Sequence, residues 1–276
     1  MQASKILCFD VDNTLYPRSS GLGKAMGDRI VLWVREHVDL TSIDIASLPP
    51  AAAVDSAYNH PPDIDATDEI VERLCLHYYL QHGLTIVGLL KGARSKKHGE
   101  PLSPADEQSY LDEVHAPSQH LERFMPHPHE HAATRELLAA LRDEGFPLFL
   151  FSNAHADHVW RVIEHLGLEP QAFEGLLDYY QLRDNCKPRA RSYEMMLEMI
   201  RARHPDAVPA DVLFFDDARV NLKAAKEFGF GTVLVAGEGV AAHHEAPYID
   251  YVVDDVRSTA KMREIVAGFC QSKPRT

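Results

Sequence analysis

The chain has 276 residues, of which 45% are hydrophobic and 25% charged, a composition typical of globular proteins with a buried core. Its 41 acidic and 28 basic residues give a formal net charge of −13, which argues against a nucleic acid partner, because phosphate backbones bind clustered lysine and arginine. No apolar run approaches the roughly 20 residues that span a bilayer, and the N-terminus lacks a signal-peptide pattern. Because the four cysteines show no close pairing, we expect a cytoplasmic protein with reduced thiols and no membrane partner.

The first predicted element is a buried strand at residues 5–10, a short apolar run that ends at an acid. The next hundred residues are rich in helical patterns, at 24–37, 68–82 and 104–114, and poor in strand-like runs. Proline punctuates this stretch and marks its end. We therefore expect a helical insertion over residues 18–124, which divides a core domain into residues 1–17 and 125–276.

Four further strands are predicted in the second half, at residues 147–152, 211–216, 231–236 and, more weakly, 251–253. Amphipathic segments at 134–144, 191–203 and 221–228 predict helices between them. Strands that alternate with helices across short turns indicate the α/β class. We therefore expect a Rossmann-like, doubly wound parallel sheet.

Two acids follow the first strand, Asp10 and Asp12, with Thr14 two residues further on. Ligands of doubly wound sheets bind beyond the carboxyl ends of the strands, so both acids project toward a candidate site. Two carboxylates can divide the work of phosphate ester hydrolysis: Asp10 would attack phosphorus, and Asp12 would protonate the leaving oxygen and then activate water. The alternative is an acidic turn that caps a helix.

Polar residues follow two later segments. Ser152 and Asn153 close the strand at 147–152, where a hydroxyl and backbone N–H groups can hold a phosphoryl oxygen. Lys187, which precedes Pro188, can neutralise both an attacking carboxylate and a transferring phosphoryl group. Taken singly, the first segment is better explained by a Ser-Asn turn and the second by a surface loop.

Paired carboxylates, Asp216 and Asp217, end the strand at 211–216. Adjacent acids repel each other unless a cation or a proton relieves them. Oxygen ligands of this kind suit Mg²⁺, which retains several waters and also binds substrate phosphate. The pair therefore predicts a magnesium site, without deciding whether Asp216 or only Asp217 is a direct ligand.

Taken in order, these segments resemble the four motifs of the haloacid dehalogenase superfamily: Asp10-x-Asp12-x-Thr14, Ser152, Lys187 and Asp216-Asp217. The resemblance implies a Rossmann-like core and an aspartyl-phosphate mechanism, with Asp10 as nucleophile and Asp12 as general acid and base. An acid at position 12 favours the phosphatases over the dehalogenases of that superfamily.

The same resemblance implies the binding roles. Thr14 and Ser152 would bind phosphate, and Lys187 would steady the negative charge. Asn221 stands where many members have a further acid. The implied ligands of Mg²⁺ are Asp10, the backbone carbonyl of Asp12 and Asp217. Asp216 would be an additional ligand or would contact the direct ligands without contacting the ion.

The predicted insertion resembles the helical C1-type cap of the superfamily. Segments 9–17, 78–89 and 214–221 resemble the pyrimidine 5′-nucleotidase branch found in fungi and plants, which implies a nucleoside monophosphate substrate, UMP or CMP. The sequence of residues 91–103 departs from that of the plainer members of this branch. A phosphatase for another small metabolite, such as a sugar phosphate or pyridoxal phosphate, is therefore the alternative, and a regulatory protein without catalysis is the third possibility.

Several other residues are interpreted as structural. The histidines at 127–131 could bind zinc, but their spacing around Pro128 favours a structural junction. Cys186 and His158 are interpreted as packing residues. His155 is a slightly stronger candidate for the site, because it follows Asn153. Tyr16 fits a cavity rim or the core equally well.

Overall fold

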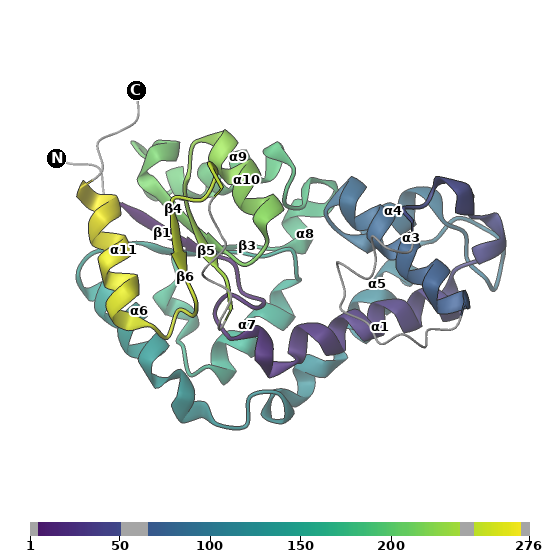
Figure 1. Ribbon diagram of the computed structural model, residues 1–276, viewed down its shortest axis with the longest axis horizontal. Helices are drawn as coiled ribbons and strands as arrows, with labels where there is room; N and C mark the ends of the chain where they lie inside the picture. The colour runs from purple at the N-terminus through teal and green to yellow at the C-terminus, as the bar shows by residue number, and fades with distance from the viewer. Residues whose placement is uncertain (1–4, 51–65, 238–245, 272–276) are drawn as a thin grey trace. The chain divides into compact units, whose positions relative to one another are not determined.

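The computed structural model describes residues 5–50, 66–237 and 246–271 (Figure 1). The chain forms two compact units, one of residues 1–23 with 120–276 and the other of residues 24–119. Within the described ranges, no helix is both long and apolar enough to cross a membrane.

The larger unit is built on a six-stranded parallel sheet with the strand order β3-β2-β1-β4-β5-β6. The strands are β1 (Ile6–Phe9), β2 (Leu148–Phe151), β3 (Gly175–Leu177), β4 (Val212–Asp216), β5 (Gly231–Val235) and β6 (Tyr251–Val253). The predicted doubly wound parallel sheet is confirmed, and all five expected strands are present. The strand β3 was not expected, because this edge strand has three residues and two of them are only half-buried, so it makes no long apolar run.

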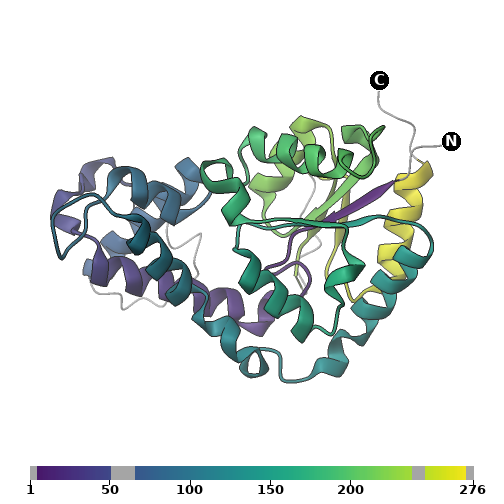
Figure 2. The same ribbon diagram turned by 180° about the vertical axis from the view of Figure 1, so that it is seen from behind.

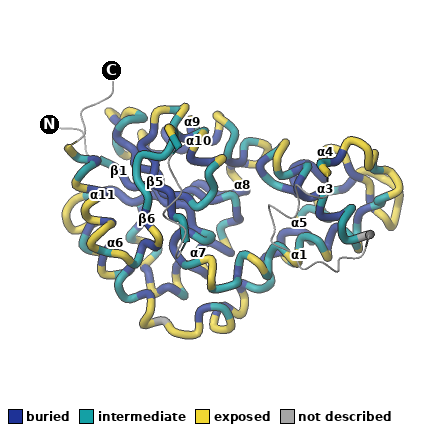
Figure 3. Tube along the Cα trace, in the orientation of Figure 1, coloured by how far each residue is buried: buried dark blue, intermediate teal, exposed yellow. Residues whose placement is uncertain are grey.

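Helices cover both faces of this sheet (Figures 1 and 2). One face carries α6 (Ala132–Asp143), α7 (Ala156–His165) and α11 (Thr259–Gln271), and the other carries α9 (Ala190–Arg201) and α10 (Arg219–Phe228). Because both faces are covered, β1, β2, β4 and β5 are buried along their whole length (Figure 3). The helices expected at 134–144, 191–203 and 221–228 are confirmed within two residues at each end.

Local signals explain why these helices form where they do. In α6, the buried side chains are Thr134, Leu137, Leu138 and Leu141, which is the spacing of one helix face. The end of α10 is set by Gly229, whose φ of 106° is a left-handed conformation that glycine adopts without strain. The remaining short helices of this unit are α8 (Tyr179–Leu182) and the 3-10 turns η1 (Arg18–Ser20), η5 (Pro128–His131), η6 (Pro170–Ala172), η7 (Arg183–Asn185) and η8 (Pro209–Asp211).

The smaller unit is helical. It contains most of α1 (Leu22–His37), together with α3 (Ala66–His82), α4 (Thr85–Gly92), α5 (Pro104–Val114), η2 (Leu40–Ser42) and η3 (Ile45–Ser47); η4 (Ala116–Arg123) crosses its boundary. The three helices expected here are confirmed, and α4 was not expected. The segment after α4 is a tight turn closed by the bridge between Arg94 and Pro101, and a second bridge joins Val38 to Ser95.

The strand order places the candidate residues at one edge of the sheet. Beyond β1 the chain builds outward to β2 and β3 on one side and to β4, β5 and β6 on the other. The register pairs Phe9 with Leu150 and with Phe215, so the carboxyl ends of the three central strands lie level. Such a switch point, where connections leave in opposite directions, is where open α/β sheets bind ligands.

Candidate active site

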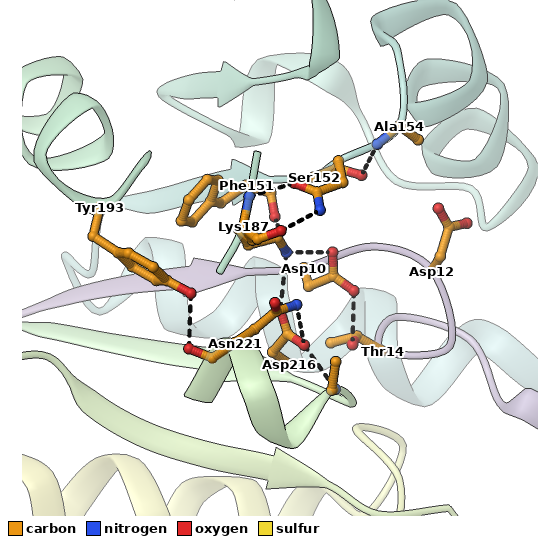
Figure 4. Close-up of polar contacts among 12 residues, drawn as sticks. Asp10, Asp12, Thr14, Phe151, Ser152, Ala154, Lys187, Tyr193, Asp216 and Asn221 are labelled. Carbon is orange, nitrogen blue, oxygen red and sulfur yellow. Dashed lines mark hydrogen bonds and ion pairs between the residues drawn. The ribbon is translucent and has the colours of Figure 1, made fainter. Parts of the chain in front are cut away.

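The residues predicted from separate segments meet at this edge (Figure 4). Asp10 directly follows β1, Ser152 directly follows β2, and Asp216 is the last residue of β4. Lys187 lies in the segment between η7 and α9. The parallel sheet therefore brings together side chains that are up to 206 positions apart in the sequence.

Lys187 is the centre of the cluster. Its Nζ donates to Asp10 Oδ1 at 2.8 Å, to Asp216 Oδ2 at 2.8 Å and to the carbonyl oxygen of Phe151 at 2.7 Å. An ammonium group has three donors, and these three bonds use them all. Burial alone would lower the pKa of Lys187, but the two carboxylates outweigh it and raise this pKa above its ordinary value. The side chain is 1% exposed and remains charged.

Two neighbours hold this arrangement in place. Asn153 Oδ1 accepts from the backbone N–H of Lys187 at 2.9 Å, and Asn153 Nδ2 donates to the Lys187 carbonyl at 3.0 Å. The observed contact of Asn153 is therefore with the lysine backbone, and its phosphate-binding role stays a prediction. Thr14 Oγ1 donates to Asp10 Oδ2 at 3.2 Å, while Ser152 Oγ accepts from the backbone N–H of Ala154 at 3.1 Å.

Asp216 is enclosed by donors. Asn221 Nδ2 lies 3.1 Å from both of its carboxylate oxygens, and the backbone N–H of Ala218 donates to Oδ1 at 2.7 Å. The backbone carbonyl of Asn221 in turn accepts a hydrogen bond from the hydroxyl of Tyr193 at 2.7 Å. Asn221, which stands where many superfamily members have an acid, thus fixes a neighbouring acid in this chain.

Three carboxylates fit a cation site. Asp10, Asp216 and Asp217 each offer one oxygen atom, and these atoms lie within 4.8 Å of one another. Burial raises the pKa of Asp10 well above its usual value, against the opposing effect of Lys187. Burial and the charge of Asp216 raise the pKa of Asp217 to about 6, although Asp217 Oδ2 pairs with the exposed Arg18 at 2.8 Å. A divalent cation would relieve this repulsion, and an all-oxygen donor set is what Mg²⁺ prefers.

Asp12 is held by two side chains that the sequence analysis did not assign to the site. Its Oδ1 accepts from the Tyr16 hydroxyl at 2.6 Å and lies 2.8 Å from His158 Nε2. Burial and the nearby Asp12 raise the pKa of Tyr16 well above its ordinary value, so the phenol stays neutral and donates. One signal could have identified His158: it lies in the first turn of the helix that follows Ser152, and such a turn begins at the carboxyl edge of the sheet.

The remaining candidates, Cys186 and the histidines at 127–131, lie in surroundings that fit a structural role. Burial raises the pKa of Cys186 to about 12, and its thiol donates to the carbonyl of Arg183, so it is not a competing nucleophile. His131 is buried at the start of α6, whereas His127 and His129 are exposed. Among the described residues, the acids above are the only group of three or more side chains with metal-ligand geometry, and the histidines at 127–131 are not part of it.

A family model described as haloacid dehalogenase-like hydrolase matches residues 4–229. Among curated proteins, Phosphate metabolism protein 8 of Saccharomyces cerevisiae is 23% identical over 241 residues, which cover 84% of this chain and 61% of the yeast protein. Enolase-phosphatase E1 of Methylococcus capsulatus is 29% identical over 126 residues, 44% of this chain and 51% of that protein. The aligned regions thus cover less than two thirds of either relative.

Solved structures share the fold at low sequence identity. β-Phosphoglucomutase from Clostridium difficile has a TM-score of 0.54 and 13% identity, with 97% of this chain and 98% of that chain covered. CbbY from Rhodobacter sphaeroides, solved with phosphate, has a TM-score of 0.53 and 15% identity, with 92% and 96% covered. At this identity the likeness concerns the architecture alone.

Proposed function

The chain belongs to the haloacid dehalogenase-like hydrolases, and from this premise we propose that it is a magnesium-dependent phosphatase that forms an aspartyl phosphate on Asp10. The observation that carries the proposal is the setting of that carboxylate. It lies at the switch point of the sheet and accepts hydrogen bonds from Lys187 and Thr14, and oxygen atoms of Asp216 and Asp217 lie close by. A curated relative that is named as a phosphatase supports the same reaction class.

The reaction would take two steps. In the first, an oxygen of Asp10 attacks phosphorus, the bond from phosphorus to the leaving oxygen breaks, and Asp12 gives its proton to the departing alcohol. In the second, Asp12 takes a proton from water while the water oxygen attacks phosphorus. The bond to Asp10 then breaks, its electron pair returns to the carboxylate, and inorganic phosphate leaves. Lys187 neutralises charge on Asp10 and on the phosphoryl oxygens throughout.

Magnesium would be held by Asp10, Asp217 and the backbone carbonyl of Asp12. Asp216 would either bind the ion directly or contact its direct ligands. When bound, the ion neutralises phosphoryl oxygens and the repelling carboxylates. Both oxygens of Asp216 already accept hydrogen bonds from protein groups, whereas Asp217 pairs with Arg18, whose side chain is 71% exposed. This difference favours Asp217 as the direct ligand.

The proposed substrate is a pyrimidine nucleoside 5′-monophosphate, UMP or CMP. It is supported by the resemblance of segments 9–17, 78–89 and 214–221 to the pyrimidine 5′-nucleotidase branch. We propose further that the helical unit serves as the cap that selects this substrate. The second candidate substrate is another small phosphorylated metabolite, such as a sugar phosphate or pyridoxal phosphate. It is supported by residues 91–103, which look like an insertion relative to the plainer members of that branch.

The test is phosphate release from UMP, CMP, AMP, GMP, a sugar phosphate and pyridoxal phosphate, with Mg²⁺ and with a chelator. Asp10→Asn should lower turnover at least about 1,000-fold, because it removes the nucleophile but keeps the side-chain size. Asp143→Asn is the matched control, since Asp143 is an exposed acid at the end of α6, and it should retain full activity.

The outcomes separate the claims. Preference for UMP and CMP supports the nucleotidase, and a broad or sugar-phosphate-led profile keeps the mechanism but rejects that substrate. Activity in the chelator would contradict the magnesium requirement, and activity of Asp10→Asn would contradict the nucleophile. No activity on any compound would favour a regulatory protein.

A further inference from the structure

Two buried donors converge on one oxygen of Asp12. The Tyr16 hydroxyl and His158 Nε2 lie 2.6 Å and 2.8 Å from Oδ1, and they come from different parts of the unit, the turn after β1 and the first turn of α7. The donor side chains are almost fully buried, whereas the side chain of Asp12 is 24% exposed. The carboxylate is therefore anchored from the protein interior and is partly exposed to solvent.

Both donors hold the same oxygen of the carboxylate, Oδ1. They fix the rotation of the group about its bond to Cβ, which otherwise has a broad preference. They also decide which oxygen carries the proton, because a proton on Oδ1 would meet the hydroxyl of Tyr16 and the N–H of His158. The proton of the neutral acid belongs on Oδ2.

We propose that Tyr16 and His158 are positioning residues that hold Oδ1 of Asp12, so that Oδ2 delivers the proton to the leaving oxygen. The inference rests on the proposed phosphatase function and adds two residues to it. Neither side chain touches the reacting atoms in this arrangement. Their effect is on the orientation of the acid that does.

The consequence is a dependence on the leaving group. An alkoxide is a poor leaving group and needs the proton of Asp12, whereas 4-nitrophenolate leaves without one. The value of kcat/KM reports the first step, in which the leaving group departs. Loss of either donor should therefore lower kcat/KM for an alkyl phosphate such as glycerol 2-phosphate by about tenfold or more, and change it much less for 4-nitrophenyl phosphate.

The experiment compares both substrates with Mg²⁺ in Tyr16→Phe, His158→Ala and His158→Gln. Gln places an N–H donor near the position of Nε2, so His158→Gln should recover most of the alkyl phosphate activity that His158→Ala loses. Tyr16→Phe removes a single oxygen atom and tests the proposal even where His158→Ala does not fold. His204→Ala is the control, since His204 contacts Glu174, which precedes β3 at the amino end of that strand, whereas the site lies at the carboxyl ends of the strands.

Equal losses on the two substrates in Tyr16→Phe would overturn the proposal, as would a His158→Gln enzyme no better than a folded His158→Ala enzyme. Either result leaves the proposed function standing, provided that the unaltered enzyme is active and Asp10→Asn is not. Absence of phosphate release from both compounds by the unaltered enzyme would overturn the function and this inference together.

Discussion

At the scale of single residues, one buried cation compensates two acids. Lys187 contacts both Asp10 and Asp216, and its ring neighbours Phe151 and Phe214 keep water from its side chain. Charges removed from water are tolerated in a protein when they are paired and hydrogen-bonded. Removal of the cation would leave two close carboxylates without the positive charge that pairs with both.

Lys187→Met should lower the free energy of unfolding by about 3–5 kcal/mol at neutral pH without Mg²⁺, the usual effect of breaking a buried pair. Urea denaturation followed by circular dichroism measures it. The control is Lys223→Met on α10, an exposed lysine 4.0 Å from Glu227, which should change stability by less than about 0.5 kcal/mol. Adding Asp216→Asn to Lys187→Met should restore part of the loss. Equal effects of the two lysine variants would contradict the assignment.

At the scale of elements, the contact of α3 with α4 depends on a missing side chain. The ring of Tyr78 in α3 packs on Gly88 of α4, where an added Cβ would lie 2.3 Å from ring atoms. The Tyr78 hydroxyl reaches Gly92 one turn later, where a Cβ would lie 2.6 Å away. Glycine lowers helix stability, so its presence at both positions is explained by this close approach.

Gly88→Ala should therefore lower the melting temperature, because overpacking of this kind costs about 1–3 kcal/mol. Gly27→Ala in α1 is the matched control: among the described residues, no atom apart from the adjoining helix backbone and the two chain neighbours lies within 4 Å of the added Cβ. The helix preference of alanine should therefore stabilise this variant by up to about 1 kcal/mol. Thermal unfolding followed by circular dichroism distinguishes the two. A stabilised Gly88→Ala protein would show that the ring can move aside.

At the scale of the whole molecule, buried histidines couple folding to pH. Burial lowers the pKa of His131 below its ordinary value of 6.5, with a further contribution from Arg257, and burial also lowers that of His155. Between the lowered pKa and 6.5 the unfolded chain binds more protons than the folded one. The stability that these histidines contribute therefore rises with pH across this window and is lost as the pH falls through it.

We expect the unfolding free energy of the unaltered protein to fall relative to that of His131→Gln between pH 7 and pH 5, because the variant has no group to protonate there. The raised pKa values of Asp10 and Asp217 act in the opposite direction but are common to both proteins, so they cancel in this difference. The difference between the two proteins should change by at most roughly 1.4 kcal/mol per pH unit. Urea denaturation at several pH values measures it. A difference that stays constant with pH would contradict a lowered pKa at His131.

The elements that the sequence predicted are those with long, regular patterns. The apolar runs before Asp10, Ser152 and Asp216 predicted strands, since a strand covered on both faces must be apolar along its length. The elements that were not expected are β3, which is too short to form an apolar run, and the helices α4, α7 and α11. Of these, α7 does carry a regular pattern, because His158, Val159, Val162 and Ile163 are buried along one face. Asn153 shows the limit for a site residue, because a phosphate contact was expected and the structure shows a contact with the backbone of Lys187.

The sequence by itself determined the fold class, the family and the placement of acids at strand ends, because these depend on local patterns and on motifs in order. Only the tertiary structure decided which partner each acid has. The bonds from Lys187 to Asp10 and from His158 to Asp12 join positions 177 and 146 residues apart. Such contacts follow from how the crossovers stack on the sheet, and a linear pattern does not encode that distance. For this reason His158, which was interpreted as a packing residue in the sequence, lies against the proposed acid in the structure. Tyr16, which fitted a cavity rim or the core equally well, also contacts that acid.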